Sequence, residues 1–145
     1  MNRRRFLRAS AVATMGFQVV PSRVFGANSR LAVAGIGAGG KGRADITGAA
    51  KAGADIVALC DVDDDRGANM FKAHPKAKRF KDFRVMLEKM GKSIDACTIS
   101  TPDHTHAVAT SLAMKMGKHC YTQKPLTHNV YEARHLTKLA AETGV

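Results

Sequence analysis

Short apolar runs alternate with longer stretches of helical periodicity along most of the chain. The apolar runs predict strands at 31–36, 56–60, 78–80, 94–99 and 119–122, and the stretches between and after them predict helices at 42–51, 63–73, 83–90, 105–116 and 130–143. This alternation is typical of parallel βαβ units. We therefore expect an α/β fold, a Rossmann-type doubly wound parallel sheet, with the three-residue run at 78–80 at an edge.

Several polar residues mark where these helices begin and end. Asp82 and Asp103 are expected helix caps, and Asn129 followed by Glu132 resembles a capping box. Gly144 is expected to end the last helix, and Val145 then looks like the first residue of a sixth strand. We therefore expect residues 27–145 to be an incomplete Rossmann domain, without its last strand and without a second domain.

The first 26 of the 145 residues read as an export signal. Three consecutive arginines, Arg3 to Arg5, precede Phe6 and Leu7, and a modestly apolar stretch leads to small residues around Gly26. This order is similar to a twin-arginine signal peptide, and cleavage after Gly26 fits it best. A short amphipathic helix is the alternative. Export by this route predicts a periplasmic or otherwise extracytoplasmic protein that folds before it is exported.

Charge and composition narrow the function classes. The formal net charge is +11, but five of the 23 basic residues lie in the first 26 positions, so the rest holds 18 basic and 12 acidic residues. A basic stretch between Lys72 and Lys92 lacks interleaved aromatics beyond Phe80 and Phe83, so we interpret it as a solvated face, with a nucleic-acid groove as the alternative. No apolar run is long enough to span a membrane.

The three cysteines are expected to be small core residues. Cys60, Cys97 and Cys120 are far apart, show no CxxC spacing and each lie in an apolar run that reads as a strand. Disulfides are not expected in a protein that folds in the cytoplasm. We also expect no metal site, since the one close histidine pair, His104 and His106, has no third ligand suitably spaced.

A glycine-rich stretch after the first predicted strand offers GxGxxG in two registers, starting at Gly35 or Gly37. The register of Gly37, Gly39 and Gly42 leaves an uninterrupted strand before it and opens the helix at Arg43. Such glycines permit a tight turn, approach of a pyrophosphate and close helix packing. We expect the loop formed by Gly37, Ala38, Gly39, Gly40 and Gly42 to contact a dinucleotide, with an ordinary glycine turn as the alternative.

Asp61 ends the second predicted strand, 24 residues after Gly37. A carboxylate there can accept hydrogen bonds from both ribose hydroxyls and would repel a 2′-phosphate. This favours NAD over NADP, although the nearby Arg66 leaves NADP open.

Two further stretches complete a family pattern. Residues 100–106 read Ser100, Thr101, Pro102, Asp103, His104, Thr105, His106, and a second stretch runs from Gly117, Lys118 and His119 to Gln123, Lys124 and Pro125. With the glycine loop, they resemble the Gfo/Idh/MocA family of oxidoreductases, named for glucose-fructose oxidoreductase, inositol dehydrogenase and a rhizopine-catabolism protein. The resemblance covers residues 30–145.

The resemblance implies site residues. It places Ser100, Thr101, Pro102 and His106 along the cofactor, and Gln123 and Lys124 beside it, with Lys124 near the reacting carbon as the candidate catalytic residue. Most members have Glu before that lysine, so Gln123 departs from the pattern. The resemblance also implies a second α+β domain that holds much of a sugar site. We expect the full-length protein to be a homo-oligomer.

The topology of such a sheet leads to the same place. Ligands of doubly wound sheets bind beyond the carboxyl ends of the strands, where the first and fourth strands part. The glycine loop, the 101–106 loop and Lys124 all follow strands at that crevice. Each has a plainer alternative: His104 and His106 as residues of a helix start, and Lys124 as a solvent-exposed lysine before a turn.

Three functions remain open. The first is an NAD(P)-dependent oxidoreductase that transfers hydride between nicotinamide and a sugar or polyol, with a tightly bound cofactor regenerated on the exported enzyme, since no free NAD pool exists outside the cell. The second is an NAD-dependent glycosidase that acts by transient oxidation and elimination. The third is a non-catalytic NAD-binding module.

Overall fold

The computed structural model describes residues 30–145, so the predicted signal at 1–26 lies outside the described residues. Eleven elements follow one another in it: β1 (Ala32–Ile36), α3 (Gly40–Lys51), β2 (Asp55–Cys60), α4 (Asp64–Ala73), β3 (Lys78–Phe80), α5 (Phe83–Met90), the 3-10 turn η2 (Gly91–Ser93), β4 (Ala96–Ile99), α6 (Asp103–Lys115), β5 (His119–Thr122) and α7 (Val130–Thr143). Strands and helices alternate as the hydrophobic pattern predicted.

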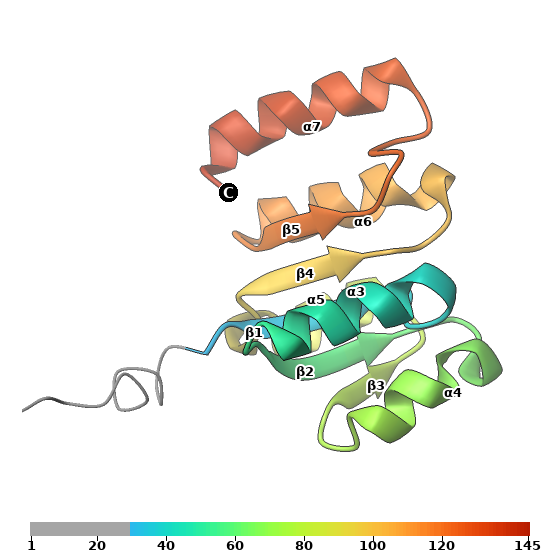
Figure 1. The fold of residues 1–145 in the computed structure, drawn as a ribbon. Helices are drawn as coiled ribbons and strands as arrows, with labels where there is room; N and C mark the ends of the chain where they lie inside the picture. The colour runs from blue at the N-terminus through green and yellow to red at the C-terminus, as the bar shows by residue number, and fades with distance from the viewer. Residues whose placement is uncertain (1–29) are drawn as a thin grey trace, which may run out of the picture. The chain divides into compact units, whose positions relative to one another are not determined.

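The five strands form one parallel sheet in the order β3-β2-β1-β4-β5 (Figure 1). β1 is central, with Ile36 paired to Cys60 of β2 on one side and to Ile99 of β4 on the other. The chain passes from β3 at one edge across to β4, so the strand order reverses between β1 and β4. This is the doubly wound arrangement, and it confirms the predicted fold class.

Helices cover both faces of the sheet, and each face has its own core. On one face, Ile46 of α3 and Met70 and Phe71 of α4 pack over Leu59 of β2. On the other face, the buried residues of α5 and α6 pack over the strands; those from the helices are Met86, Leu87, Met90, Ala109 and Ala113. α7 packs beside α6 through Leu136 and Leu139, in a smaller cluster with Met114.

Helix caps agree with the sequence in most places. Asp63 and Asp82 accept hydrogen bonds from backbone N–H groups of α4 and α5, and Gly144 ends α7 with a φ of 73°. Asn129 caps α7 through the N–H of Glu132, but the Glu132 carboxylate accepts from the N–H of His128 rather than from Asn129, so the capping box is only half formed.

Two predicted helix starts were wrong. α6 begins at Asp103 itself, after Pro102. The Asp103 carboxylate accepts the adjacent His104 N–H and faces the His104 and His128 rings, and it does not cap the helix. α3 begins at Gly40 rather than at Gly42 or Arg43, so two glycines of the motif lie within the helix. The helix can start there because glycine tolerates the φ of 49° that Gly40 adopts.

Burial determines the protonation state of the three cysteines. Cys60 and Cys97 are buried and Cys120 is half-buried, and all three are free thiols. Burial raises the pKa of Cys60 and of Cys97 to about 12 and that of Cys120 to about 11. They are therefore protonated core residues, as the sequence predicted, and not nucleophiles.

The basic stretch contains several locally paired side chains. Lys81 pairs with Asp64 at 2.7 Å and Arg84 with Asp82 at 2.6 Å. The Arg79 guanidinium lies over the Phe71 ring, 5.1 Å from its centroid. The two ion pairs neutralise part of the local positive charge. Within residues 30–145, no helix is both long and apolar enough to cross a membrane.

Gly42 is essential to how closely α3 packs, because a Cβ built there would lie 1.7 Å from the Gly37 carbonyl oxygen. We predict that Gly42→Ala displaces the loop, lowers the free energy of unfolding by about 2 kcal/mol or more and removes NADH binding. Gly48→Ala is the matched control on the same helix. Its Cβ would meet nothing within 4 Å, so it should stabilise by up to about 1 kcal/mol. Urea unfolding and NADH fluorescence titration measure both; equal behaviour of the two variants would contradict the prediction.

Candidate cofactor site

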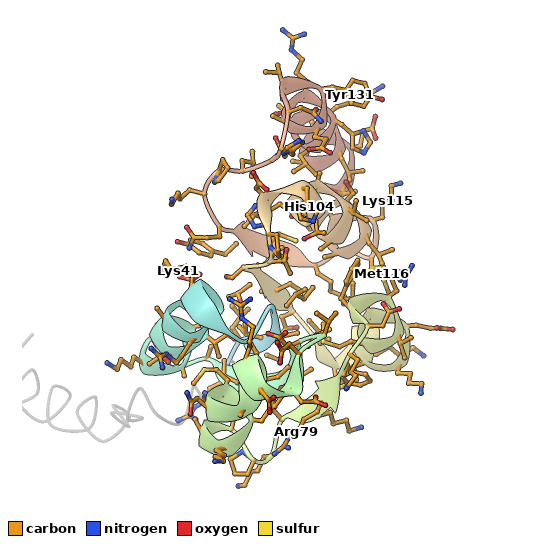
Figure 2. All side chains as sticks on the ribbon, turned by 90° about the vertical axis from the view of Figure 1, so that its right-hand side faces the viewer. Lys41, Arg79, His104, Lys115, Met116 and Tyr131 are labelled. Carbon is orange, nitrogen blue, oxygen red and sulfur yellow. The ribbon has the colours of Figure 1, made fainter. Side chains whose placement is uncertain are left out.

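A cleft of about 410 Å³ opens at the carboxyl ends of β1, β2 and β4, the end that faces the viewer in Figure 2. Its lining includes seven of the predicted site residues: Gly37, Gly39, Gly40, Asp61, Ser100, Thr101 and Pro102. Sequence reasoning missed Lys41, Lys81 and Phe83, which also line it, and named Arg66 only as a complication. The structure therefore brings the glycine loop, the ribose candidate and the loop after β4 together.

The glycine loop turns tightly against the loop that follows β4. Gly37 adopts a φ of 84°, and a Cβ there would lie 2.7 Å from the Ser100 carbonyl oxygen. The Gly37 N–H donates to the Cys60 carbonyl, and the Ser100 N–H donates to the Ile36 carbonyl, so both loops are attached to neighbouring strand ends. The first turn of α3 follows directly, without a side-chain cap, and a helix start of this kind can present N–H groups to an anion.

The Asp61 carboxylate holds the loop ends together. One oxygen accepts the Gly39 N–H at 2.9 Å, and the other accepts the Asp63 N–H at 3.0 Å. Each carboxylate oxygen can accept more than one hydrogen bond, so Asp61 keeps capacity for ribose hydroxyls. Arg66 lies close by, since a Cβ on Gly39 would be 2.9 Å from the Arg66 Cβ.

Two predicted residues lie beneath the cleft rather than in its lining. Ala38 is fully buried, in a core cluster with residues of α3 and α4, so neither its side chain nor its backbone faces the cleft. Gly42 is buried against the Gly37 carbonyl. Their expected cofactor contacts stay predictions.

Thr101 contributes a polar group whose partner is not within the described chain. Its hydroxyl oxygen is buried and has no hydrogen-bond partner among residues 30–145. Since buried hydroxyls are normally paired, this atom is a position at which a rearranged loop or a bound ligand would supply a partner.

His106 joins the two loops that flank the crevice. Its ring is 1% exposed; Nε2 lies 2.7 Å from the Thr101 carbonyl oxygen and Nδ1 lies 2.8 Å from the Pro125 carbonyl oxygen. Both partners are acceptors, and a neutral imidazole donates only one such bond. His106 thus ties the loop after β4 to the loop after β5, whereas His104 is exposed on α6 (Figure 2).

Lys124 lies between two anchored residues. Gln123 before it donates its backbone N–H to the Ile99 carbonyl, and Pro125 after it is held by His106. The Lys124–Pro125 peptide is cis, and Lys124 itself is exposed. Neither Gln123 nor Lys124 lines the cleft described above, so their role in a cofactor or substrate site stays a prediction.

Sequence reasoning missed Asp45, on the second turn of α3. Its carboxylate accepts hydrogen bonds from the Lys41 ammonium at 2.6 Å, the Ser100 hydroxyl at 2.7 Å and the Gln123 amide at 2.9 Å. Its position in the sequence gave no motif, because Ser100 and Gln123 are distant along the chain.

The net pKa of Asp45 lies below its usual value. Burial alone raises it, but the hydrogen bonds from Lys41, Gln123 and Ser100 and the Lys41 charge together outweigh burial. A lowered pKa means that the stabilisation by this carboxylate is present above the unfolded-state pKa, about 3.8, and is lost as the pH falls through the lower folded value.

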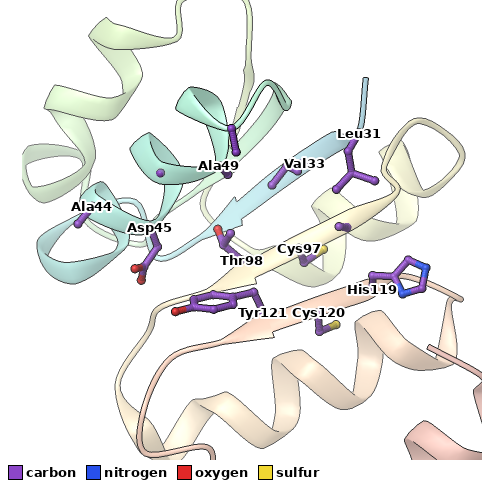
Figure 3. Close-up of a pocket in the computed structure, with 13 residues that line it drawn as sticks. Leu31, Val33, Ala44, Asp45, Ala49, Cys97, Thr98, His119, Cys120 and Tyr121 are labelled. Atoms are coloured by element: carbon purple, nitrogen blue, oxygen red, sulfur yellow. The ribbon is translucent and has the colours of Figure 1, made fainter. Parts of the chain in front are cut away.

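A second hollow of about 510 Å³ lies along α3, over β1, β4 and β5 (Figure 3). Apolar residues line most of it, with Asp45 near the end where Tyr121 lies. Its lining contains no lysine or arginine, the side chains that most often pair with a pyrophosphate. Across the described part of the chain, no cluster of His, Cys, Asp or Glu is arranged to hold a metal ion.

Fold and cleft together define a dinucleotide-binding Rossmann domain. Residues 29–145 match the model of the GFO_IDH_MocA oxidoreductase family with an NAD-binding Rossmann fold, and the chain belongs to that family. The resemblance seen in the sequence is thereby confirmed.

Three curated relatives are dehydrogenases or reductases of sugars. A 1,5-anhydro-D-fructose reductase of Ensifer adhaerens is 29% identical over 76% of this chain and 33% of its own length. A D-apiose dehydrogenase of Paraburkholderia graminis is 30% identical over 64% of this chain and 24% of its own. A UDP-N-acetylglucosamine 3-dehydrogenase of Acidithiobacillus ferrooxidans is 30% identical over 60% of this chain and 26% of its own. The chain thus spans a third or less of each.

Solved structures show the same fold. The WlbA dehydrogenase of Bordetella pertussis, in complex with NADH and UDP-GlcNAcA, has a TM-score of 0.72 at 23% identity, over 80% of this chain and 35% of that one. The WlbA dehydrogenase of Thermus thermophilus, in complex with NAD and α-ketoglutarate, has a TM-score of 0.70 at 26% identity, over 79% and 39%.

The residues present fit NAD. The cradle formed by Gly37 and Gly39 has no room for side chains, the start of α3 offers N–H groups to a pyrophosphate, and Asp61 offers acceptors to a ribose. NAD is therefore the cofactor of this domain.

His106 provides a test of how the two loops are held. We predict that His106→Leu lowers the free energy of unfolding by about 1–3 kcal/mol, because the ring loses its polar contacts with the Thr101 and Pro125 carbonyls, including the hydrogen bond that it donates to one of them. The exposed His104→Leu is the matched control and should change it by less than about 0.5 kcal/mol. Urea unfolding measures both. A His106 variant as stable as the control would show that the ring does not join the loops.

Proposed function

We propose that the protein carrying this chain is an oxidoreductase that transfers hydride between NAD and a hydroxyl-bearing carbon of a sugar or sugar-like alcohol. The observation that supports the proposal is that Lys124 follows β5 between anchored residues, with β1 and β4 lying between β5 and β2, the strand that Asp61 follows. The sugar-related names of the relatives support the substrate class.

The chemistry divides between cofactor and chain. Nicotinamide, when bound, supplies the hydride acceptor or donor. Oxidation of an alcohol carbon breaks its C–H bond with loss of a hydride and its O–H bond with loss of a proton, and a C=O bond forms. Lys124 is the group of the described chain that we assign to the hydroxyl, where a positioned amine takes the proton and a positioned ammonium returns it in the reverse direction.

The arginine-rich start of the chain favours a cofactor that is kept and recycled. If residues 1–26 direct twin-arginine export, the protein works outside the cytoplasm, where no free NAD pool can replace a lost cofactor. The same observation favours a second candidate function, an NAD-dependent glycosidase that oxidises, eliminates and then returns the hydride, since it has no net redox change. Product analysis on glycosides against free sugars separates the two.

For cofactor choice we predict NAD over NADP, from Asp61. Asp61→Ser removes the charge that repels a 2′-phosphate and should shift the ratio of the NADPH and NADH dissociation constants by at least tenfold, about 1.4 kcal/mol. The ratio is the quantity to measure, because loss of the Gly39 contact weakens both cofactors alike.

The control for that experiment is Asp65→Ser, which removes an exposed carboxylate in the first turn of the neighbouring helix α4. It should leave the ratio unchanged. Fluorescence titration with each reduced cofactor gives both constants. An unchanged ratio in Asp61→Ser would show that Asp61 does not face the ribose.

For catalysis we predict that Lys124→Ala lowers the single-turnover rate of hydride transfer by ~10² to 10⁴, the range for a positioned acid or base, and changes NADH affinity far less. The assay follows nicotinamide absorbance in the whole protein with a sugar found by screening.

Lys115→Ala is the matched control, since Lys115 is an exposed lysine at the C-terminal end of α6 (Figure 2). It should behave as wild type. If Lys124→Ala loses cofactor binding while hydride transfer on the bound cofactor stays intact, Lys124 is structural.

A further inference from the structure

Gln123 connects α3 to the candidate catalytic lysine. Its side-chain Nε2 donates to an Asp45 carboxylate oxygen at 2.9 Å, while its Oε1 accepts the Lys124 backbone N–H at 2.8 Å. The amide orientation is fixed by both ends, because only the nitrogen can face a carboxylate and only the oxygen can face an N–H. Displacement of either partner would disturb the other.

Asp45 is itself firmly held. Its side chain is 6% exposed, and Lys41 and Ser100 occupy the rest of its carboxylate. Ser100 belongs to the loop after β4 that lines the cofactor cleft. One buried carboxylate therefore joins helix α3, the loop after β4 and the residue before Lys124.

We propose that Asp45 is a positioning residue for Lys124: through Gln123 it fixes the backbone from which the lysine reaches the reacting hydroxyl. The role of Lys124 in this proposal rests on the proposed function. The hydrogen-bond network of Asp45 and Gln123 does not depend on it. It also assigns a reason to Gln123, because an amide at position 123 can donate to the carboxylate that α3 supplies and still accept the Lys124 N–H.

Glutamate at position 123 would conflict with this arrangement. One of its oxygens could still accept the Lys124 N–H, but the other would take the place of Nε2, 2.9 Å from an Asp45 oxygen. Two carboxylates that close cannot both be ionised; they share a proton or move apart. Charge at position 45 and charge at position 123 therefore exclude each other, and an amide and a carboxylate can exchange places between the two positions.

The test is a double-mutant cycle of Asp45→Asn, Gln123→Glu and the two together. At neutral pH, Gln123→Glu should speed hydrogen exchange in the peptide 121–126 about tenfold, the factor equivalent to about 1.4 kcal/mol. The double variant should return exchange to near the wild-type rate, because the amide introduced at position 45 donates to the carboxylate introduced at position 123. Additive effects of the two changes would overturn the proposal.

The pH dependence adds a readout that ordinary misfolding would not give. As the pH falls, the two carboxylates of Gln123→Glu can share a proton, so its thermal stability relative to wild type should recover, and the double variant should show no such dependence. A stability deficit in Gln123→Glu that is the same at every pH would overturn the proposal.

Glu142→Gln is the matched control. Glu142, like Asp45, pairs with a lysine four residues earlier, but the pair lies on the exposed face of α7 with a separation of 3.8 Å. It should leave exchange in the peptide 121–126 unchanged; the same acceleration there would mean that loss of any helical carboxylate has this effect, which would overturn the proposal.

Hydride transfer separates this proposal from the one on which it rests. If Lys124 is catalytic, Gln123→Glu should lower the rate at saturating NADH and sugar about tenfold, with recovery in the double variant. If Lys124→Ala leaves the rate unchanged while the cycle still shows rescue of exchange, the proposed function fails and the Asp45 network stands. If Lys124→Ala abolishes the rate and the cycle shows no rescue, the network fails alone.

Discussion

The separation between α3 and the glycine loop is set by the contact of Gly42 with the Gly37 carbonyl. A Cβ at position 42 would lie 1.7 Å from that oxygen, and 3.2 Å from the Ser100 Cβ, so the helix can approach both loops only because this residue has no side chain. Protein interiors do not stretch to accept such an overlap. The approach brings the helix start to the cleft and, one turn later, brings Asp45 to Ser100 and Gln123.

The crevice is held by polar ties of two kinds. Backbone hydrogen bonds, such as that from the Ser100 N–H to the Ile36 carbonyl, fix where each loop leaves the sheet. Side chains then tie the loops to one another: His106 joins Thr101 to Pro125, and Asp45 joins α3 to Gln123. Because these groups are largely out of solvent, each tie is costly to break, which is how a site built from loops keeps a fixed shape.

The sequence predicted the fold class, the edge position of β3 and the positions of all five strands to within about two residues, because hydrophobic period and glycine punctuation are local properties. It failed at the starts of α3 and α6. At α3, a helix that begins on Gly40 depends on a φ of 49° and on packing against Gly37, neither of which a propensity pattern shows. It found seven of the residues that line the cleft through their motifs, but it missed Lys41, Lys81 and Phe83 there, and it could not find Asp45.

Asp45 shows why a motif is an incomplete description of a site. Within residues 123–125 alone, Gln123 reads as the loss of a charge beside Lys124. In three dimensions, a carboxylate 78 residues earlier in the chain lies 2.9 Å from the Gln123 amide. A hydrogen-bonded pair constrains the two residue types jointly. A carboxylate that faces an amide satisfies both groups, whichever position holds the carboxylate, whereas two facing carboxylates do not. A departure from a family pattern therefore has to be judged together with the side chain that it faces.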